Sequence, residues 1–173
     1  MLSPLVESVS DLTGPWWVAH TKARNEKAFA WDLYKRDIGY YLPLHERVII
    51  SGGRKRRVLK PVFPSYVFFS GEVEDRRAAM TTNRLCMTIE VKDPDQLVRE
   101  LTHFERVLAV KAPLSPVVNI AEGKICRVTS GPLRGIEGVV VKKGNVSTFF
   151  LRVSIIPGGA MMEIDGALLE PVY

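Results

Sequence analysis

The densest cluster of charged residues in the sequence is a run of four cationic side chains that follows a glycine pair at residues 52–53. The run consists of Arg54, Lys55, Arg56 and Arg57, and the stretch 47–60 contains no acidic residue. Uncompensated cations in one place raise the local concentration of anions and bind phosphates without reading base sequence. The run therefore predicts a nucleic-acid contact, with a solubilising loop as the alternative.

Side chains for catalysis or metal binding are not grouped in the sequence. The three histidines, His20, His45 and His103, lie far apart and lack the spacing of metal ligands. The sequence has no P-loop, no GxSxG and no HExxH motif. Cys86 and Cys126 lack CxxC spacing and are predicted to be buried thiols. We expect a protein that is not an enzyme and that holds no cofactor and no metal.

The composition is that of a folded globular chain. Of the 173 residues, 46% are hydrophobic and 25% are charged. The net charge is +5, and residues 1–60 hold 11 Lys and Arg against 6 Asp and Glu. No apolar run reaches the roughly 20 residues of a membrane helix, and the first residues do not resemble a secretory leader. We expect a cytoplasmic, monomeric protein without membrane contact.

Periodicity predicts strands and helices in the first two thirds of the chain. Helices are expected at 25–37, 75–82 and 94–107, and strands at 16–21, 40–44, 62–70 and 87–91. The apolar positions are Phe29, Ala30, Leu33 and Tyr34 in the first helix, and Leu97, Leu101, Phe104 and Leu108 in the last. Residues 47–51 and 57–60 predict a hairpin around the glycine pair, with the cation run at its tip or in its return arm.

The last third of the chain has a different pattern. Residues 112–116 contain two prolines and mark a stiff spacer. Five short segments separated by glycine turns follow, at 124–129, 138–142, 148–155, 160–164 and 168–171. Five short strands in so few residues predict a small barrel, because closure removes exposed sheet edges.

The predicted fold class is therefore α+β, in two domains. A flexible tail at 1–13 precedes an antiparallel sheet flanked by helices at 14–109. A linker at 110–119 then leads to a five-stranded β-barrel at 120–173. The glycine-rich and β-branched composition of residues 124–164 favours strands over helices in the second domain.

The stretch GKICRVTSGPLRGIEGVV at residues 123–140 resembles the KOW motif. Gly131 and Pro132 suit a turn, and Gly135 and Gly138 permit the backbone angles of a tight strand reversal. Val128, Ile136 and Val139 are expected to fill the interior of the barrel. The resemblance implies a small, SH3-like barrel.

The first half of the chain resembles the NusG N-terminal domain. The resemblance rests on WVAHT at 17–21 followed by Glu26-Lys27, on YLPL at 41–44 and on FPSYVF at 63–68. The two resemblances together cover residues 15–172. The cation run ahead of Phe63-Pro64 is more similar to specialised paralogues, such as RfaH and the capsule-operon regulators, than to the housekeeping factor.

Members of this family bind the clamp helices of the largest RNA polymerase subunit through an apolar depression. The matching positions here are Trp17, Tyr41, Phe63, Pro64, Tyr66 and Phe68. Phe63 and Tyr66 cannot both share a face with Phe68 in a regular strand, so some of these side chains are core instead. The cation run would lie near DNA at the upstream fork of the transcription bubble.

The resemblance implies a transcription elongation and antitermination factor that docks on the polymerase clamp and promotes processive elongation. The alternative is a KOW-type protein that binds RNA or the ribosome directly. The barrel implies a second protein partner, but the turn IIPGG at 155–159 lacks the aromatic residue that housekeeping members use for Rho or a ribosomal protein. This departure puts both of those partners in question. Residues 84–87, RLCM, also depart from the usual Pro-Gly-Val block, which puts bridging of the polymerase cleft in question.

Overall fold

The structure is a computed structural model that describes residues 1–4, 6–117, 123–143 and 146–173. The chain forms two compact units, from Met1 to Val98 and from Arg99 to Tyr173. Helices and antiparallel sheets occur together, which confirms the predicted α+β class. No helix in the described ranges is both long and apolar enough to cross a membrane.

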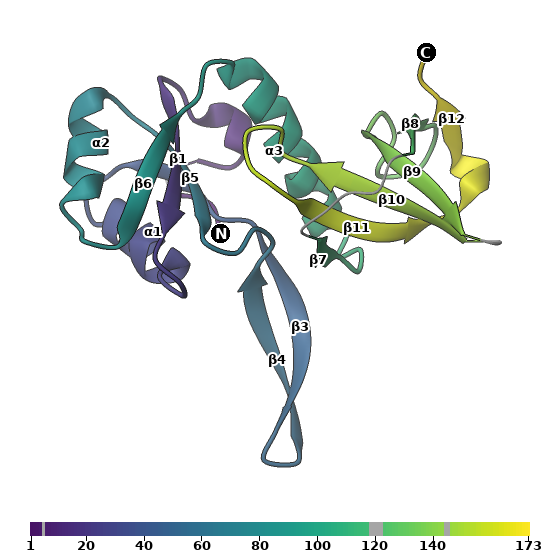
Figure 1. The fold of residues 1–173 in the computed structure, drawn as a ribbon, viewed down its shortest axis with the longest axis horizontal. Helices are drawn as coiled ribbons and strands as arrows, with labels where there is room; N and C mark the ends of the chain where they lie inside the picture. The colour runs from purple at the N-terminus through teal and green to yellow at the C-terminus, as the bar shows by residue number, and fades with distance from the viewer. Residues whose placement is uncertain (5, 118–122, 144–145) are drawn as a thin grey trace. The chain divides into compact units, whose positions relative to one another are not determined.

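The first unit is built on a four-stranded antiparallel sheet in the order β2-β5-β1-β6 (Figure 1). The strands are β1 (Trp16–Thr21), β2 (Gly39–Tyr41), β5 (Tyr66–Ser70) and β6 (Leu85–Glu90), and the helices are α1 (Glu26–Tyr34) and α2 (Val73–Met80). Both helices pack on one face of the sheet, where Phe29 of α1 meets Phe69 of β5 edge to face at 6.1 Å between ring centroids. Successive strand residues point to opposite faces, so Phe68 lies on the other side.

Helix α1 ends earlier than the predicted helix at 25–37. Asp37 takes a left-handed conformation with φ of 56°, and the amide of Ile38 donates to the carbonyl of Leu33 at 3.1 Å. This arrangement terminates a helix and satisfies its last carbonyls. Phe29, Ala30 and Leu33 are fully buried as predicted. Tyr34 was predicted to share their apolar face, but it is 38% exposed and its ring pairs with that of the exposed Trp31.

The strand predicted at 62–70 begins only at Tyr66. Pro64 has no amide hydrogen for a sheet, and Ser65 has φ of 68°, so both interrupt an extended strand. The amide of Tyr66 instead closes a turn onto the carbonyl of Phe63 at 3.1 Å. Because Phe63 lies outside the strand, its side-chain direction does not follow the alternation of β5. Its ring packs against that of Phe68, with 5.8 Å between the ring centroids.

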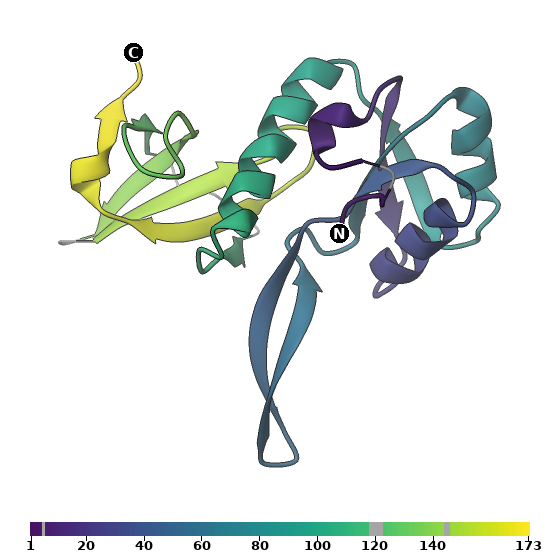
Figure 2. The same cartoon turned by 180° about the vertical axis from the view of Figure 1, so that it is seen from behind.

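The hairpin of β3 (Leu44–Ser51) and β4 (Arg54–Pro61) pairs over eight positions and projects from the sheet (Figures 1 and 2). Gly52 and Gly53 take φ of 57° and 72°, which is the geometry of a two-residue turn with both central residues left-handed. The strands are longer than predicted. The whole cation run therefore lies within β4.

The segment at 1–13, predicted as a flexible tail, contains regular structure. Leu2 forms a β-bridge with Tyr41, and residues Val9–Asp11 make a 3-10 turn, η1, capped by the hydroxyl of Ser8. Val9 is fully buried, and Leu12 is 8% exposed. These apolar contacts hold the segment against β2, where a side chain at Gly39 would collide with Leu12.

Helix α3 (Pro94–Ala109) begins in the first unit and ends in the second. Its buried residues include the predicted Leu97, Leu101 and Phe104. The fourth is Val107 rather than the predicted Leu108, which is half-buried.

The second unit is a six-stranded antiparallel sheet in the order β12-β8-β9-β10-β11-β7. Its elements are β7 (Ser115–Val117), β8 (Lys124–Val128), β9 (Glu137–Lys143), β10 (Val146–Arg152), β11 (Gly159–Ile164), the 3-10 turn η2 (Gly166–Leu168) and β12 (Leu169–Pro171). The sequence predicted five of these strands. Strand β7 was missed because it lies in the proline-containing stretch that was assigned to the linker at 110–119. Residues 118–119 of the predicted linker and residues 120–122 of the predicted second domain lie outside the described ranges.

Glycine is required at position 138, near the start of β9, where β9 pairs with β10. A Cβ on Gly138 would lie 2.5 Å from the carbonyl oxygen of Phe150 and 2.7 Å from the Phe149 ring. Val128 and Ile136 are buried as predicted, whereas Val139 is half-buried and its neighbour Val140 takes the inner position.

Candidate functional site

The sheet face opposite α1 and α2 gathers most of the side chains predicted to contact polymerase. Cross-strand partners share a face, and Phe68 pairs with both Val18 of β1 and Tyr41 of β2. Tyr41 is 4% exposed and Phe68 is fully buried. Phe63, at 3% exposure, packs on Phe68. These three aromatics form a buried row on this side of the sheet.

The next row on the same face is accessible. Tyr66 pairs with His20, and His20 pairs with Met87, so three side chains from β5, β1 and β6 lie side by side. The Tyr66 and His20 rings stack with centroids 5.0 Å apart and planes inclined by 16°. Both are half-buried, Met87 is 50% exposed, and Pro64 is exposed beside them. The accessible row of Tyr66, His20 and Met87 is the part of this face that a partner can touch.

Trp17 does not join this face. It pairs with Phe69, which points into the core under the helices, and only 6% of its surface is exposed. Its indole Nε1 donates to the carbonyl of Gly71 at 3.0 Å, and the Arg76 guanidinium lies over its ring at 5.0 Å. These contacts give Trp17 a structural role in the core.

Sequence reasoning missed His20 and Met87 as parts of the surface. His20 was predicted to be a strand or surface residue rather than a metal ligand, and no role in docking was assigned to it. Within the described ranges no group of His, Cys, Asp and Glu could hold a metal ion. The alternation from Val18 to His20 was a usable signal, because it places His20 on the face away from Trp17. Met87 could be placed only once the register between β1 and β6 was known. Cys86, predicted to be buried, is exposed at a register shift between β1 and the edge strand β6, whereas Cys126 is buried.

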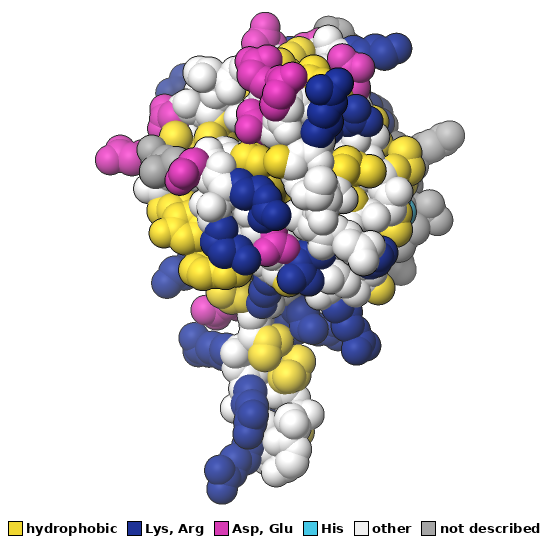
Figure 3. Space-filling model, turned by 90° about the vertical axis from the view of Figure 1, so that its left-hand side faces the viewer, with side chains coloured by type: hydrophobic (Ala, Val, Ile, Leu, Met, Phe, Trp, Pro, Cys, Tyr) yellow, Lys and Arg dark blue, Asp and Glu magenta, His cyan; other side chains and the backbone are white. Residues whose placement is uncertain are grey.

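The hairpin distributes its cations over both of its faces. Arg54 and Arg56 share one face with Arg47, whereas Lys55 and Arg57 share the other with Val48 and Ile50. All four residues of the cation run are exposed, and Lys and Arg side chains are visible along the hairpin (Figure 3). Arg57 reaches Glu46 at 3.8 Å, but both side chains are more than 60% exposed, so the pair neutralises little charge.

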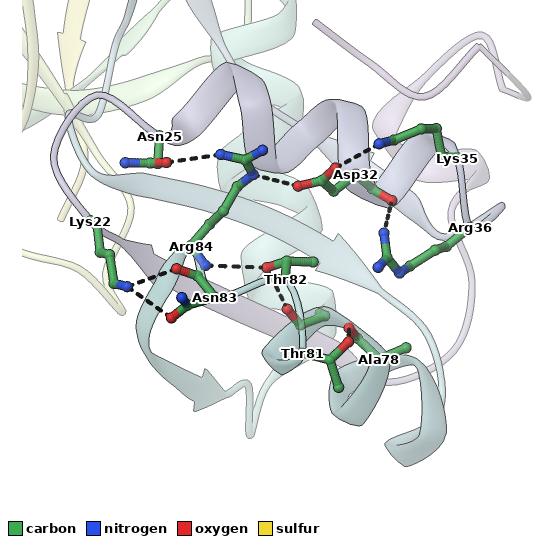
Figure 4. A network of polar contacts seen from close by, with 11 residues as sticks. Lys22, Asn25, Asp32, Lys35, Arg36, Ala78, Thr81, Thr82, Asn83 and Arg84 are labelled. Carbon is green, nitrogen blue, oxygen red and sulfur yellow. Dashed lines mark hydrogen bonds and ion pairs between the residues drawn. The ribbon is translucent and has the colours of Figure 1, made fainter.

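A polar network ties the loop before α1 to the loop before β6 (Figure 4). Lys22 donates from Nζ to the backbone and side-chain oxygens of Asn83 at 2.7 and 3.0 Å. Arg84 donates to the Asp32 carboxylate and, at 3.1 Å, to the Asn25 side-chain oxygen. Burial alone would raise the pKa of Asp32, but hydrogen bonds from Arg84 and Lys35 outweigh burial and lower the pKa below 3.8. Arg84 is therefore neutralised locally and serves to hold the two loops together.

The first unit matches a known protein family. The protein-family model described as "NusG: Transcription termination factor nusG" matches residues 14–100. A chain of the crystal structure of the MjSpt4:Spt5 complex, conformation B, is 16% identical and aligns over 91% of this chain and 96% of that chain, with a TM-score of 0.27. No curated protein sequence matches.

Proposed function

This chain belongs to the NusG family, and on that premise we propose that it docks on the RNA polymerase clamp and acts in transcription elongation as an antitermination factor. Membership of the NusG family supports a role in transcription elongation or termination. The proposal of clamp docking and antitermination rests on the surface of the first unit, and above all on the accessible row of Tyr66, His20 and Met87, which lies within the residues matched by the family model.

The accessible row has the properties of a protein docking site. A stacked Tyr–His pair offers flat, rigid area, and methionine adapts to an apolar partner at low cost. The buried row of Tyr41, Phe63 and Phe68 lies next to it on the same side of the sheet and supports the shape of the surface. Binding hot spots are typically aromatic anchors on such rigid supports. We propose that polymerase clamp helices contact Tyr66, His20, Met87 and Pro64, with Tyr41, Phe63 and Phe68 in support.

The hairpin supplies the nucleic-acid contact in this proposal. Its cations lie on both faces of a two-stranded arm that projects from the docking unit (Figure 3). Contacts of this kind to phosphates add affinity that depends on salt and not on base sequence. They would favour the elongation complex, in which DNA lies beside polymerase. The cation run also supports assignment to the specialised paralogues typified by RfaH.

The second unit is proposed to be a KOW barrel that acts as a tethered adaptor for a second protein. The close packing at Gly138 and the left-handed φ of Gly131 and Gly135 suit the tight strand reversals of such a barrel. A tether raises the effective concentration of the second partner near the polymerase. The whole mechanism needs binding alone, without catalysis, because a factor that prefers the closed elongating state stabilises that state by its difference in affinity.

The test is binding of the full chain to a peptide hairpin that carries the polymerase clamp helices. Tyr66→Ala and Met87→Ala should each weaken binding, and loss of the aromatic anchor should cost about tenfold or more. Met80→Ala is the matched control, since Met80 is 43% exposed but lies on α2. Phe63→Ala is unsuitable because its buried ring supports the fold.

Each outcome has a definite meaning. Loss of binding in Tyr66→Ala and Met87→Ala, with Met80→Ala unchanged, supports docking through the accessible row. Absence of binding by the wild-type protein contradicts clamp docking. In that case, pull-down of structured RNA and ribosomes tests the alternative of a KOW-type RNA-binding protein.

A further inference from the structure

Helix α1 presents a pair of exposed aromatic rings that takes no part in the docking surface. Trp31 is 56% exposed and Tyr34 is 38% exposed. Their ring centroids are 5.0 Å apart, with planes inclined by 38°. By contrast, Trp16 and Trp17 are only 2% and 6% exposed. The pair lies on the outer side of α1, away from the core residues Phe29, Ala30 and Leu33.

The ionic side chains of α1 beside this pair are sorted by charge, and the exposed Asp37 lies three residues after Tyr34, beyond the end of the helix. Lys27 and Lys35 lie four residues before and after Trp31, which places both beside its ring on the exposed helix face. The carboxylates of α1 are turned inward, since Glu26 and Asp32 are each only 7% exposed. Glu26 accepts the Ser65 amide at 2.7 Å, and Asp32 is held by Arg84.

The same face continues toward the cationic hairpin. Lys27 donates from Nζ to the carbonyl of Leu59 in β4 at 2.7 Å, so the helix surface meets the root of the hairpin. Over residues 22–37 the sequence has five Lys and Arg against three Asp and Glu. Lys35 forms an ion pair with Asp32, with 2.9 Å between Nζ and Oδ1, but half of the Lys35 side chain is still exposed. Figure 3 shows the side of the molecule that carries α1 and α2. On this side, hydrophobic side chains lie next to Lys and Arg side chains above the hairpin.

We propose that Trp31 and Tyr34 form a stacking platform for unpaired bases of a single-stranded nucleic acid, with Lys27 and Lys35 beside its phosphates. Aromatic rings inside a cationic surface are the shared feature of proteins that bind single strands. A duplex keeps its bases stacked on one another, so only an unpaired base can offer its face to an indole. The inward turn of Glu26 and Asp32 leaves the exposed charge of the helix cationic, which favours a negatively charged partner over a basic or apolar one. The exposed rings then favour a partner that offers unpaired bases for stacking. The platform does not depend on clamp docking.

Intrinsic fluorescence provides a direct assay, because Trp31 is the exposed tryptophan of the three in the chain. The full-length protein is titrated with a single-stranded deoxythymidine 12-mer, a uridine 12-mer and a duplex of equal length. Quenching of Trp31 and anisotropy of the labelled oligonucleotide are both recorded. The two single strands distinguish DNA from RNA as the source of the bases.

The variants separate stacking from charge. Trp31→Ala should weaken single-strand binding by about tenfold or more and abolish the quenching. Trp31→Phe keeps a ring and should recover much of the affinity. The double substitution of Arg54 and Arg56 by Gln should weaken single strands and duplex alike. Met80→Ala, an exposed apolar residue on α2, should bind as wild type.

Three results would each overturn the platform. The first is wild-type protein that binds neither single strand or binds without quenching. The second is Trp31→Ala that binds single strands as tightly as wild type. The third is Trp31→Ala that loses duplex and single-strand binding equally. Circular dichroism and thermal unfolding of each variant confirm that the exposed substitutions leave the fold intact.

Discussion

The Asp32–Arg84 pair makes a quantitative test of how the first unit is held together. We consider Asp32→Ala. The Asp32 side chain is 10% exposed and that of Arg84 is 35% exposed. Removing one partner of a fully buried ion pair costs about 3–5 kcal/mol. Because a third of Arg84 remains open to water, we expect about half of that, roughly 2 kcal/mol.

Urea unfolding followed by tryptophan fluorescence measures this loss. All three tryptophans lie in the unit from Met1 to Val98, so the signal reports on that unit. A double-mutant cycle with Arg84→Ala isolates the coupling, for which we expect about 1 kcal/mol or more. Lys35→Ala is the control. Its side chain is 50% exposed, so its pair with Asp32 should contribute less than about 1 kcal/mol. A cost below about 0.5 kcal/mol for Asp32→Ala, or a coupling near zero, would refute the reasoning.

Three further predictions concern pH, packing and charge. Because the folded-state pKa of Asp32 lies below 3.8, the stabilisation that its carboxylate provides is present above about pH 4 and is lost as pH falls through the folded-state pKa. The free energy of unfolding of the wild type, measured as a function of pH, should decrease in this range, and that of Asp32→Asn should decrease less. Gly138→Ala should destabilise the second unit by about 1–3 kcal/mol, because its Cβ meets the Phe150 carbonyl at 2.5 Å; amide hydrogen exchange in β9 and β10 would reveal the change, and wild-type protection would contradict it. Replacing Arg54 and Arg56 by Gln should lower the salt dependence of nucleic-acid binding by about two in the slope of log K against log salt; an unchanged slope would remove these residues from the contact.

The elements predicted from the sequence were right where one physical signal acted alone. The cation run and the glycine pair gave the hairpin, because a left-handed glycine turn and two extended arms need no long-range partner. The predictions were wrong where contacts between distant parts of the chain determine whether a strand forms or a side chain is buried. Strand β7 forms in a proline-containing stretch because β11 supplies its pairing, which local propensity does not report. The burial of Val107 in place of Leu108 also depends on packing partners.

The candidate site shows the same division. Family resemblance led to Tyr66 and its neighbours but also to Trp17, which alternation within β1 would have placed on the other face. The register between strands was not available from the sequence. Without it, His20 could not be recognised as the ring on which Tyr66 stacks, and Met87 could not be placed in the same row. Residues that form a surface across three strands are therefore the ones that single-sequence reasoning misses.

The treatment of Tyr34 has a functional consequence. Its spacing from Ala30 and Leu33 suggested a core position, since aromatic residues at helical intervals are usually buried. The core around α1 is complete without it, and Tyr34 instead pairs with Trp31 at the surface. Trp31 and Tyr34 are 56% and 38% exposed, so each loses part of the roughly 1.5–3 kcal/mol that full burial of a large apolar side chain provides. A partner that covers them recovers part of that free energy, and the surrounding lysines select one that carries negative charge.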